Sequence, residues 1–103
     1  MAQFSVFQNP GRSTAVPFVV QVQSDRLARS LGRVVVPLAL HGKDSPGDHP
    51  LTPHMLMQGR LVYANPLDVA TVPASRLGDP VETLAEADQV RIARAVDEML
   101  SRA

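Results

Sequence analysis

The sequence predicts a mainly β protein, in which short antiparallel strands form a small curved sheet or open barrel and one C-terminal helix packs against it. Three observations support this fold class. Short β-branched and apolar runs are separated by Gly, Pro and Asn, the connections are too short for parallel crossovers, and only the final segment has clear helical periodicity. A chain of 103 residues is expected to form a single domain, spanning 1–103, whose modest core would gain from dimerisation.

About five to seven short strands are expected, because β-branched or alternating runs recur between turn residues. The expected strands cover residues 3–7, 17–22, 34–40, 55–57, 61–64 and 67–72. Gln58, Gly59 and Arg60 would form the tight turn of a hairpin. Pro37 cannot donate a ladder hydrogen bond, so its strand is expected at a sheet edge or with a bulge.

Three segments between these strands are expected to lie outside the sheet. Residues 8–15 and 41–53 are rich in Pro, Gly and polar residues, which is typical of surface loops. Residues 26–33 are too few for an independent helix and contain Gly32, so a connecting turn is expected there.

The last twenty-one residues, 83–103, are expected to form one amphipathic helix whose apolar stripe lies on the sheet. Thr83 and Glu86 have the spacing of a capping box, with Thr83 as the N-cap residue. The predicted stripe consists of Leu84, Ala85, Ile92, Ala93, Val96, Met99 and Leu100.

The charge balance opposes a nucleic-acid-binding role. Ten basic residues balance ten acidic ones, so the chain lacks the positive field expected of a protein that contacts phosphates. The one basic cluster, Arg26, Arg29 and Arg33, is expected on the surface. There are no cysteines and no run of about 20 apolar residues, so a cytoplasmic protein without a membrane span is expected.

Candidate chemical sites are weak at the level of sequence. His41, His49 and His54, with Asp44 and Asp48, fit no compact ligand spacing, so solvated side chains are expected and no metal or other cofactor. No serine lies in a recognisable nucleophile setting, and the dispersed glycines form no phosphate-binding loop.

Several segments give the chain a resemblance to the CcdB family, the toxin components of toxin–antitoxin pairs. The matching segments are QFSVF at 3–7, VQSD at 22–25, GRVVVPL at 32–38, DVATVP at 68–73, Gly78 and a terminal helix of similar length. The resemblance implies a small SH3-like barrel that forms a two-fold homodimer. It also implies a toxin that binds the A subunit of DNA gyrase and traps it on cleaved DNA, without catalysis, and that a CcdA-like antitoxin neutralises.

In the family pattern, gyrase is contacted by an aromatic-rich tail after the helix and by two isoleucines after the Ser-Asp turn. Carried over by position, the gyrase-binding residues are Arg26, Leu27, Asp97, Leu100, Ser101, Arg102 and Ala103. The tail here lacks the aromatic residues, so a non-toxic or retargeted homologue that keeps dimer and antitoxin binding is the first alternative. Flexible loops commonly order on such partners, which makes Arg12, Ser13, Asp44 and Asp48 the expected antitoxin contacts.

The second alternative is a MazF- or Kid-like mRNA endoribonuclease, because these toxins share the fold and use an Arg with an acid or hydroxyl group. Arg12 with Ser13 and Thr14, or Arg76 with Asp79, would supply such groups. The neutral charge and the four aromatic residues weigh against an RNA groove. The expected protein is therefore a binding toxin and not an enzyme.

Overall fold

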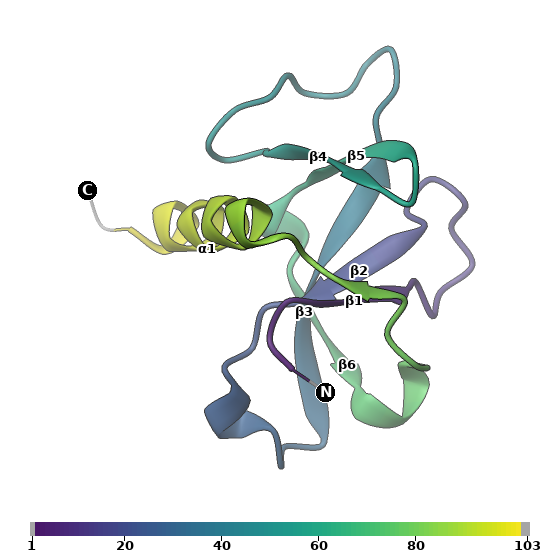
Figure 1. The fold of residues 1–103 in the computed structure, drawn as a ribbon, viewed down its shortest axis with the longest axis vertical. Helices are drawn as coiled ribbons and strands as arrows, with labels where there is room; N and C mark the ends of the chain where they lie inside the picture. The colour runs from purple at the N-terminus through teal and green to yellow at the C-terminus, as the bar shows by residue number, and fades with distance from the viewer. Residues whose placement is uncertain (1, 102–103) are drawn as a thin grey trace.

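The computed structural model describes residues 2–101. It shows a curled antiparallel sheet of seven strands and one C-terminal helix (Figure 1). This architecture confirms the predicted fold class. The strands are β1 (Ser5–Gln8), β2 (Phe18–Gln21), β3 (Gly32–Leu40), β4 (His54–Met57), β5 (Arg60–Ala64), β6 (Ala70–Pro73) and β7 (Glu82–Thr83), and the helix is α1 (Glu86–Leu100). Short 3-10 helices cover Asp25–Leu27, Pro66–Asp68 and Ala74–Arg76.

Strand β3 lies at the centre of the sheet, so the expectation that Pro37 marks an edge strand is wrong. Strand order is β4-β5-β3-β2-β1-β7, and β6 pairs with β3 beside β5. On that side of β3, pairing with β6 ends at Val35 and pairing with β5 begins at Leu38. Pro37 falls in the gap between the two partners, where its missing N–H removes no ladder hydrogen bond.

Two apolar clusters, one on each face of the sheet, form the core. The larger cluster joins strands β1 to β5 with α1, through residues that include Val20, Leu38, Met57, Val62 and Ile92. The smaller cluster, on the opposite face, contains Phe7, Val19, Val35 and Leu77. Both faces of β2 are therefore covered, and all four of its residues are buried.

The β4–β5 hairpin forms as predicted. Gln58 and Gly59 occupy the turn with φ of 51° and 79°, and Arg60 already belongs to β5. Two successive positive φ angles are typical of the tight turns that join antiparallel strands, and Gly59 adopts this geometry without steric cost. The predicted strand 67–72 is shorter than expected, because Pro66–Asp68 is a 3-10 helix.

The helix begins later than predicted, and Thr83 does not cap it. Thr83 pairs with Ser5 in β7, and Leu84 donates its N–H to the carbonyl of Phe4 at 3.0 Å. These tertiary hydrogen bonds hold the segment extended and outweigh its local capping preference. The helix therefore starts at Glu86, without a side-chain cap.

Only part of the predicted apolar stripe of α1 is buried. Of the predicted positions within α1, Ile92 is buried in the core, whereas Leu100 projects from the last turn with 69% of its surface exposed. Ala95, which was not among the predicted positions, is also buried. Within residues 2–101, no helix combines the length and the apolar character that crossing a membrane requires.

Gly32 provides a test of the close approach between β3 and β6. A Cβ at this position would lie 2.7 Å from Cγ2 of Thr71, too close for two carbon atoms. We expect Gly32→Ala to lower the free energy of unfolding by about 1 kcal/mol, because exposed Thr71 must change rotamer to make room. Denaturant unfolding measures this. In a Thr71→Ser background, which lacks the methyl group, the same substitution should cost clearly less, and an equal cost would contradict the contact.

Candidate functional site

The long loop between β3 and β4, residues 41–53, has an ordered shape. Gly42 donates its N–H to Ser45 Oγ at 2.7 Å, and Thr52 donates its hydroxyl to the carbonyl of Gly47 at 3.0 Å. Thr52 also returns its N–H to the carbonyl of His49 at 2.9 Å. The loop was predicted correctly as a surface segment, and its internal hydrogen bonds give it a defined path toward the helix.

Arg91 of α1 fastens this loop to the edge of the sheet. Its Nη2 lies 2.6 Å from Oδ1 of Asp48, and its Nη1 donates to the backbone carbonyl of His54. The same Asp48 oxygen accepts the backbone N–H of His54 at 3.1 Å. Strand β4 is the outer strand of the sheet, so the N–H and the carbonyl of His54, which point away from β5, have no strand to pair with. The Asp48–Arg91 pair, called the edge clamp below, satisfies both.

The electrostatics of the clamp depend mainly on a backbone hydrogen bond. The N–H of His54 lowers the pKa of Asp48 below its usual value, and Arg91 and the His54 ring add smaller lowering effects, while partial desolvation opposes them. Arg91 also approaches Asp88, with 3.4 Å between Nη1 and Oδ1. The clamp therefore places one carboxylate of the loop and one of the helix around a single guanidinium.

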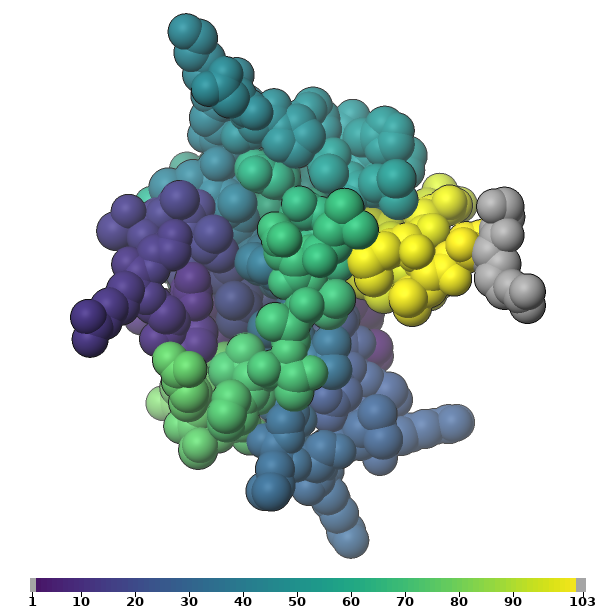
Figure 2. Space-filling view, turned by 180° about the vertical axis from the view of Figure 1, so that it is seen from behind, coloured from purple at the N-terminus to yellow at the C-terminus, as the bar shows by residue number. Residues whose placement is uncertain are grey.

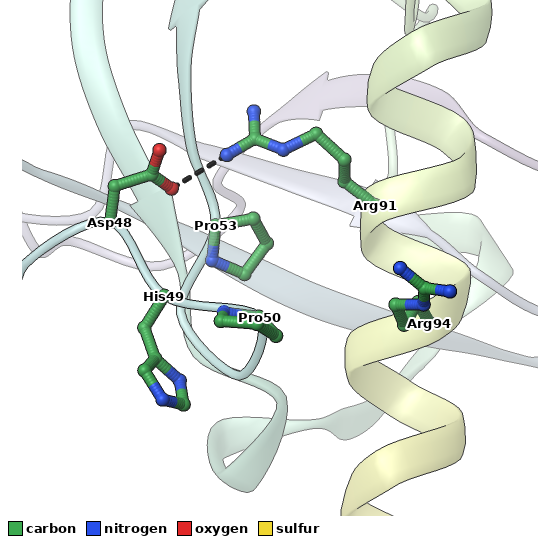
Figure 3. Close-up of a pocket in the computed structure, with 6 residues that line it drawn as sticks. All are labelled: Asp48, His49, Pro50, Pro53, Arg91 and Arg94. Atoms are coloured by element: carbon green, nitrogen blue, oxygen red, sulfur yellow. Dashed lines mark hydrogen bonds and ion pairs between the residues drawn. The ribbon is translucent and has the colours of Figure 1, made fainter.

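A hollow of about 250 Å³ lies beside the clamp, between the loop and α1 (Figure 3). Its lining, which defines the loop–helix hollow, consists of Asp48, His49, Pro50, Pro53, Arg91 and Arg94. In Figure 3 the two proline rings lie between the loop and the helix, Arg91 reaches across to Asp48, and Arg94 projects from the helix one turn further on. Arg91 and Arg94 were not predicted as site residues, since no local pattern in the sequence joins them to a loop some forty residues away.

The residues carried over as gyrase contacts fall into two groups. Arg26 and Leu27 lie in the 3-10 helix Asp25–Leu27, where Leu27 is 56% exposed. Asp97, Leu100 and Ser101 lie at the end of α1, whereas Arg102 and Ala103 are outside the described residues. In Figure 1 the 3-10 helix Asp25–Leu27 and the end of α1 lie on separate parts of the molecule, so the described part of one chain does not bring these two segments together.

The residues expected to contact an antitoxin also divide between two loops. Arg12 and Ser13 are exposed in the β1–β2 loop, and Asp44 is exposed in the β3–β4 loop. The loops adjoin at their bases, where Leu40 donates its N–H to the carbonyl of Ala15 at 2.8 Å. Asp48 differs from the other three because it belongs to the edge clamp.

The two candidate ribonuclease groups have different surroundings. Arg76 and Asp79 line one hollow together with Asn9 and Pro10, and Nη2 of Arg76 lies 3.4 Å from the carbonyl oxygen of Pro10. Arg12 and Thr14 are exposed in their loop, and Ser13 lines a separate hollow beside the β4–β5 turn. The structure thus brings the Arg76 pair to a common surface depression.

Arg33 is not the surface residue that the sequence suggested. It is 8% exposed and donates to the backbone carbonyls of Ala28, Ser30 and Gly32. Gln23 supports the same turn by donating to the carbonyl of Leu27 at 2.9 Å. These hydrogen bonds fix the backbone of the turn that carries Leu27, so the buried Arg33 side chain stabilises this part of the surface.

The histidines are partly integrated into the fold. His54 is half-buried, its ring lies 4.8 Å from that of His41 between centroids, and its Nε2 is 2.8 Å from the carbonyl oxygen of Pro46. His49 is exposed. Among residues 2–101, no three His, Cys, Asp or Glu side chains are grouped closely enough to hold a metal ion.

Because the edge clamp includes a carboxylate, the contact that holds the β3–β4 loop against α1 is expected to depend on pH. A lowered carboxyl pKa means that the clamp is intact above the usual aspartate range and is lost as the pH falls through the lowered pKa of Asp48. In an NMR titration, the Asp48 carboxyl carbon and the His54 amide proton should change together. In Arg91→Gln the pKa of Asp48 should rise but stay below its usual value, because the His54 hydrogen bond has the larger effect.

The matched control for this titration is Asp44→Asn, which removes an exposed carboxylate from the same loop. The Asp48 titration should not change in this variant. Independent titration of Asp48 and the His54 amide would contradict the clamp.

Comparisons with known proteins place this fold in a recognised group. The sequence model of the family described as CcdB protein matches residues 3–101. An endoribonuclease from a mycobacterial species, solved in complex with its cognate antitoxin, has a TM-score of 0.79 over 100% of this chain and 97% of its own, at 17% identity. A second mycobacterial endoribonuclease has a TM-score of 0.74 over 97% and 90%, at 18% identity. No curated protein matches the sequence. At these identities the structural similarity shows the fold alone.

Proposed function

The chain belongs to the CcdB family of toxins from toxin–antitoxin systems, and we propose that it acts by binding a target protein, without catalysis. The proposed target is the A subunit of DNA gyrase, and a CcdA-like antitoxin is the proposed antagonist. The observation that carries the proposal is the family match, which covers nearly the whole chain, 3–101. A homodimer in the cytoplasm is part of the same proposal.

The two projecting surfaces support a binding mechanism. Leu100 at the end of α1 and Leu27 in the first 3-10 helix are both more than half exposed, so each has apolar surface that a partner can bury. Arg33 and Gln23 hold the turn of Leu27 in place before any partner arrives. A preformed apolar anchor costs less entropy on binding than a mobile one.

Leu100 provides the direct test of the target. Purified protein should trap gyrase on cleaved DNA, and Leu100→Asp should weaken this effect at least about five-fold, because a charge would be desolvated in an apolar contact. The readout is the linear DNA released from cleavage complexes. Leu56→Asp is the matched control, since Leu56 is 68% exposed on β4, away from the helix end. Equal effects of the two substitutions, or no trapped complexes, would contradict gyrase as the target.

Endoribonuclease activity is the second candidate function, and the Arg76–Asp79 depression is the observation that favours it. Both structural neighbours described above are endoribonucleases, and a guanidinium with a nearby carboxylate suits phosphoryl chemistry. The neutral net charge of the chain weighs against it, because an RNA groove is normally basic.

An RNA cleavage assay separates the two functions. We expect the protein to leave single-stranded RNA intact under conditions in which gyrase is trapped. If RNA is cut instead, Arg76→Gln should abolish cleavage by removing the charge that stabilises the pentavalent phosphate. Arg29→Gln should not, because Arg29 is exposed on another loop. Cleavage lost in the first variant and kept in the second, with gyrase unaffected, would replace the first proposal by the second.

A further inference from the structure

We propose that the turn between β2 and β3 docks on the surface of an anionic lipid bilayer. The docking turn is defined as residues 25–31, and its contact residues are Arg26, Leu27, Arg29 and Leu31. The contact is peripheral, because only these side chains reach the lipid headgroups and the outer part of the acyl chains. The inference does not rest on the proposed function, which gives no role to Arg29 or Leu31.

Two leucines give the docking turn an apolar tip. Leu31 is 90% exposed, the highest value among the large apolar side chains of residues 2–101, and Leu27 is 56% exposed. They lie four positions apart in one compact turn, in which Ser30 donates its N–H to the carbonyl of Leu27 at 3.0 Å. Insertion of both side chains at the edge of the acyl region would remove this apolar surface from water.

Two arginines flank these leucines without an acidic partner. Arg26 and Arg29 are exposed, and within residues 2–101 neither side chain forms a hydrogen bond or an ion pair. The acid of the turn, Asp25, instead accepts the backbone N–H of Gln3 at 2.7 Å. Both guanidinium groups are therefore available to lipid phosphates, while their aliphatic stems can lie along the apolar layer.

The docking turn is held in place before any contact forms. Buried Arg33 donates to the carbonyls of Ala28 and Ser30, and Gln23 donates to the carbonyl of Leu27. A turn that is already ordered loses little conformational entropy when it binds. The buried polar side chains beneath the turn thus favour the insertion of its exposed leucines.

The position of the docking turn lets it meet a flat surface. In Figure 1 the turn lies beyond the ends of β2 and β6, and in Figure 2 the blue part of the chain that contains it extends at the lower edge of the molecule. The end of α1, which carries Asp97 and Glu98, lies on a separate part of the molecule. These carboxylates therefore do not oppose an anionic surface at the turn.

A bilayer suits this projecting tip better than a protein or a nucleic acid. A protein partner must provide a fitted pocket for each leucine, whereas lipid headgroups move aside when a side chain inserts. A nucleic acid binds through rows of phosphate contacts and offers the leucines no apolar surroundings. The combination of exposed leucines with unpaired arginines is the one that interfacial segments use on anionic membranes.

The first test measures sedimentation of the full-length protein with vesicles. Vesicles of phosphatidylcholine that contain phosphatidylglycerol should bind the protein, and vesicles of phosphatidylcholine alone should bind it much more weakly. The affinity should fall as salt is raised, because exposed charges are screened. Arg29→Gln should weaken binding about five-fold, the effect of one cation near an anionic surface. Leu31→Asp should weaken it at least about ten-fold, because it removes apolar surface and adds a repelled charge.

Each of these substitutions has a matched control on another part of the molecule. Leu56→Asp changes a leucine on β4 that is 68% exposed, and Arg94→Gln changes an exposed arginine on α1. Both controls should leave the affinity for the vesicles unchanged. Leu31 and Arg29 are exposed, so their variants should keep the fold, which unshifted amide signals of the core residues will verify.

The second test places a fluorescent reporter at the tip. The chain contains no tryptophan, so Leu31→Trp introduces a single one. Its emission should shift to the blue when vesicles with phosphatidylglycerol are added, because the indole ring leaves water. The emission of Leu56→Trp should not shift, since β4 stays in solvent.

Four outcomes would overturn the inference. They are equal binding to both kinds of vesicle, an unshifted emission of Leu31→Trp, equal effects of the test and control substitutions, and loss of gyrase trapping in Leu31→Asp without any vesicle binding by the parent protein. The last result would assign the tip to a protein partner. Absent vesicle binding with intact gyrase trapping would contradict only this inference, and vesicle binding without trapping would contradict only the proposed function.

Discussion

Strand β3 is the element on which the remaining structure depends, because it hydrogen-bonds to three other strands. Nine residues long, it pairs with β2 on one side and with β6 and then β5 on the other. On the second side the partner changes around Pro37, from β6 before it to β5 after it. The turn before β3 carries Leu27, and the loop after it carries Asp48. The Leu27 turn and the β3–β4 loop are therefore both positioned by the ends of a single strand.

The sequence predicted the elements whose signals are local. The Gln58–Gly59 turn and the periodic body of α1 depend on residues within a few positions of one another, and both were predicted correctly. The start of the helix was not, because Thr83 finds a strand partner at the other end of the chain. Tertiary hydrogen bonds determine the conformation of Thr83, and their partners lie outside any local window of the sequence.

The candidate sites show the same division. Leu27 and Leu100 were named from family positions, and their exposure became known only from the packing around them. Arg33 resembled a surface charge, although its guanidinium lies among three backbone carbonyls. The contact between Arg91 and Asp48 joins residues 43 positions apart, and no sequence pattern pairs the two residues. Long-range pairs of common polar residues such as this one can be identified only from the three-dimensional structure.

The edge clamp also affects how the protein behaves at high concentration. An uncovered outer strand can accept a strand from another molecule, and repeated addition leads to aggregates with a continuous sheet. Asp48 and Arg91 occupy the two backbone groups of His54 that such an addition would use. Substitutions in the β3–β4 loop that leave the fold intact can therefore reduce the yield of soluble protein, through intermolecular strand pairing.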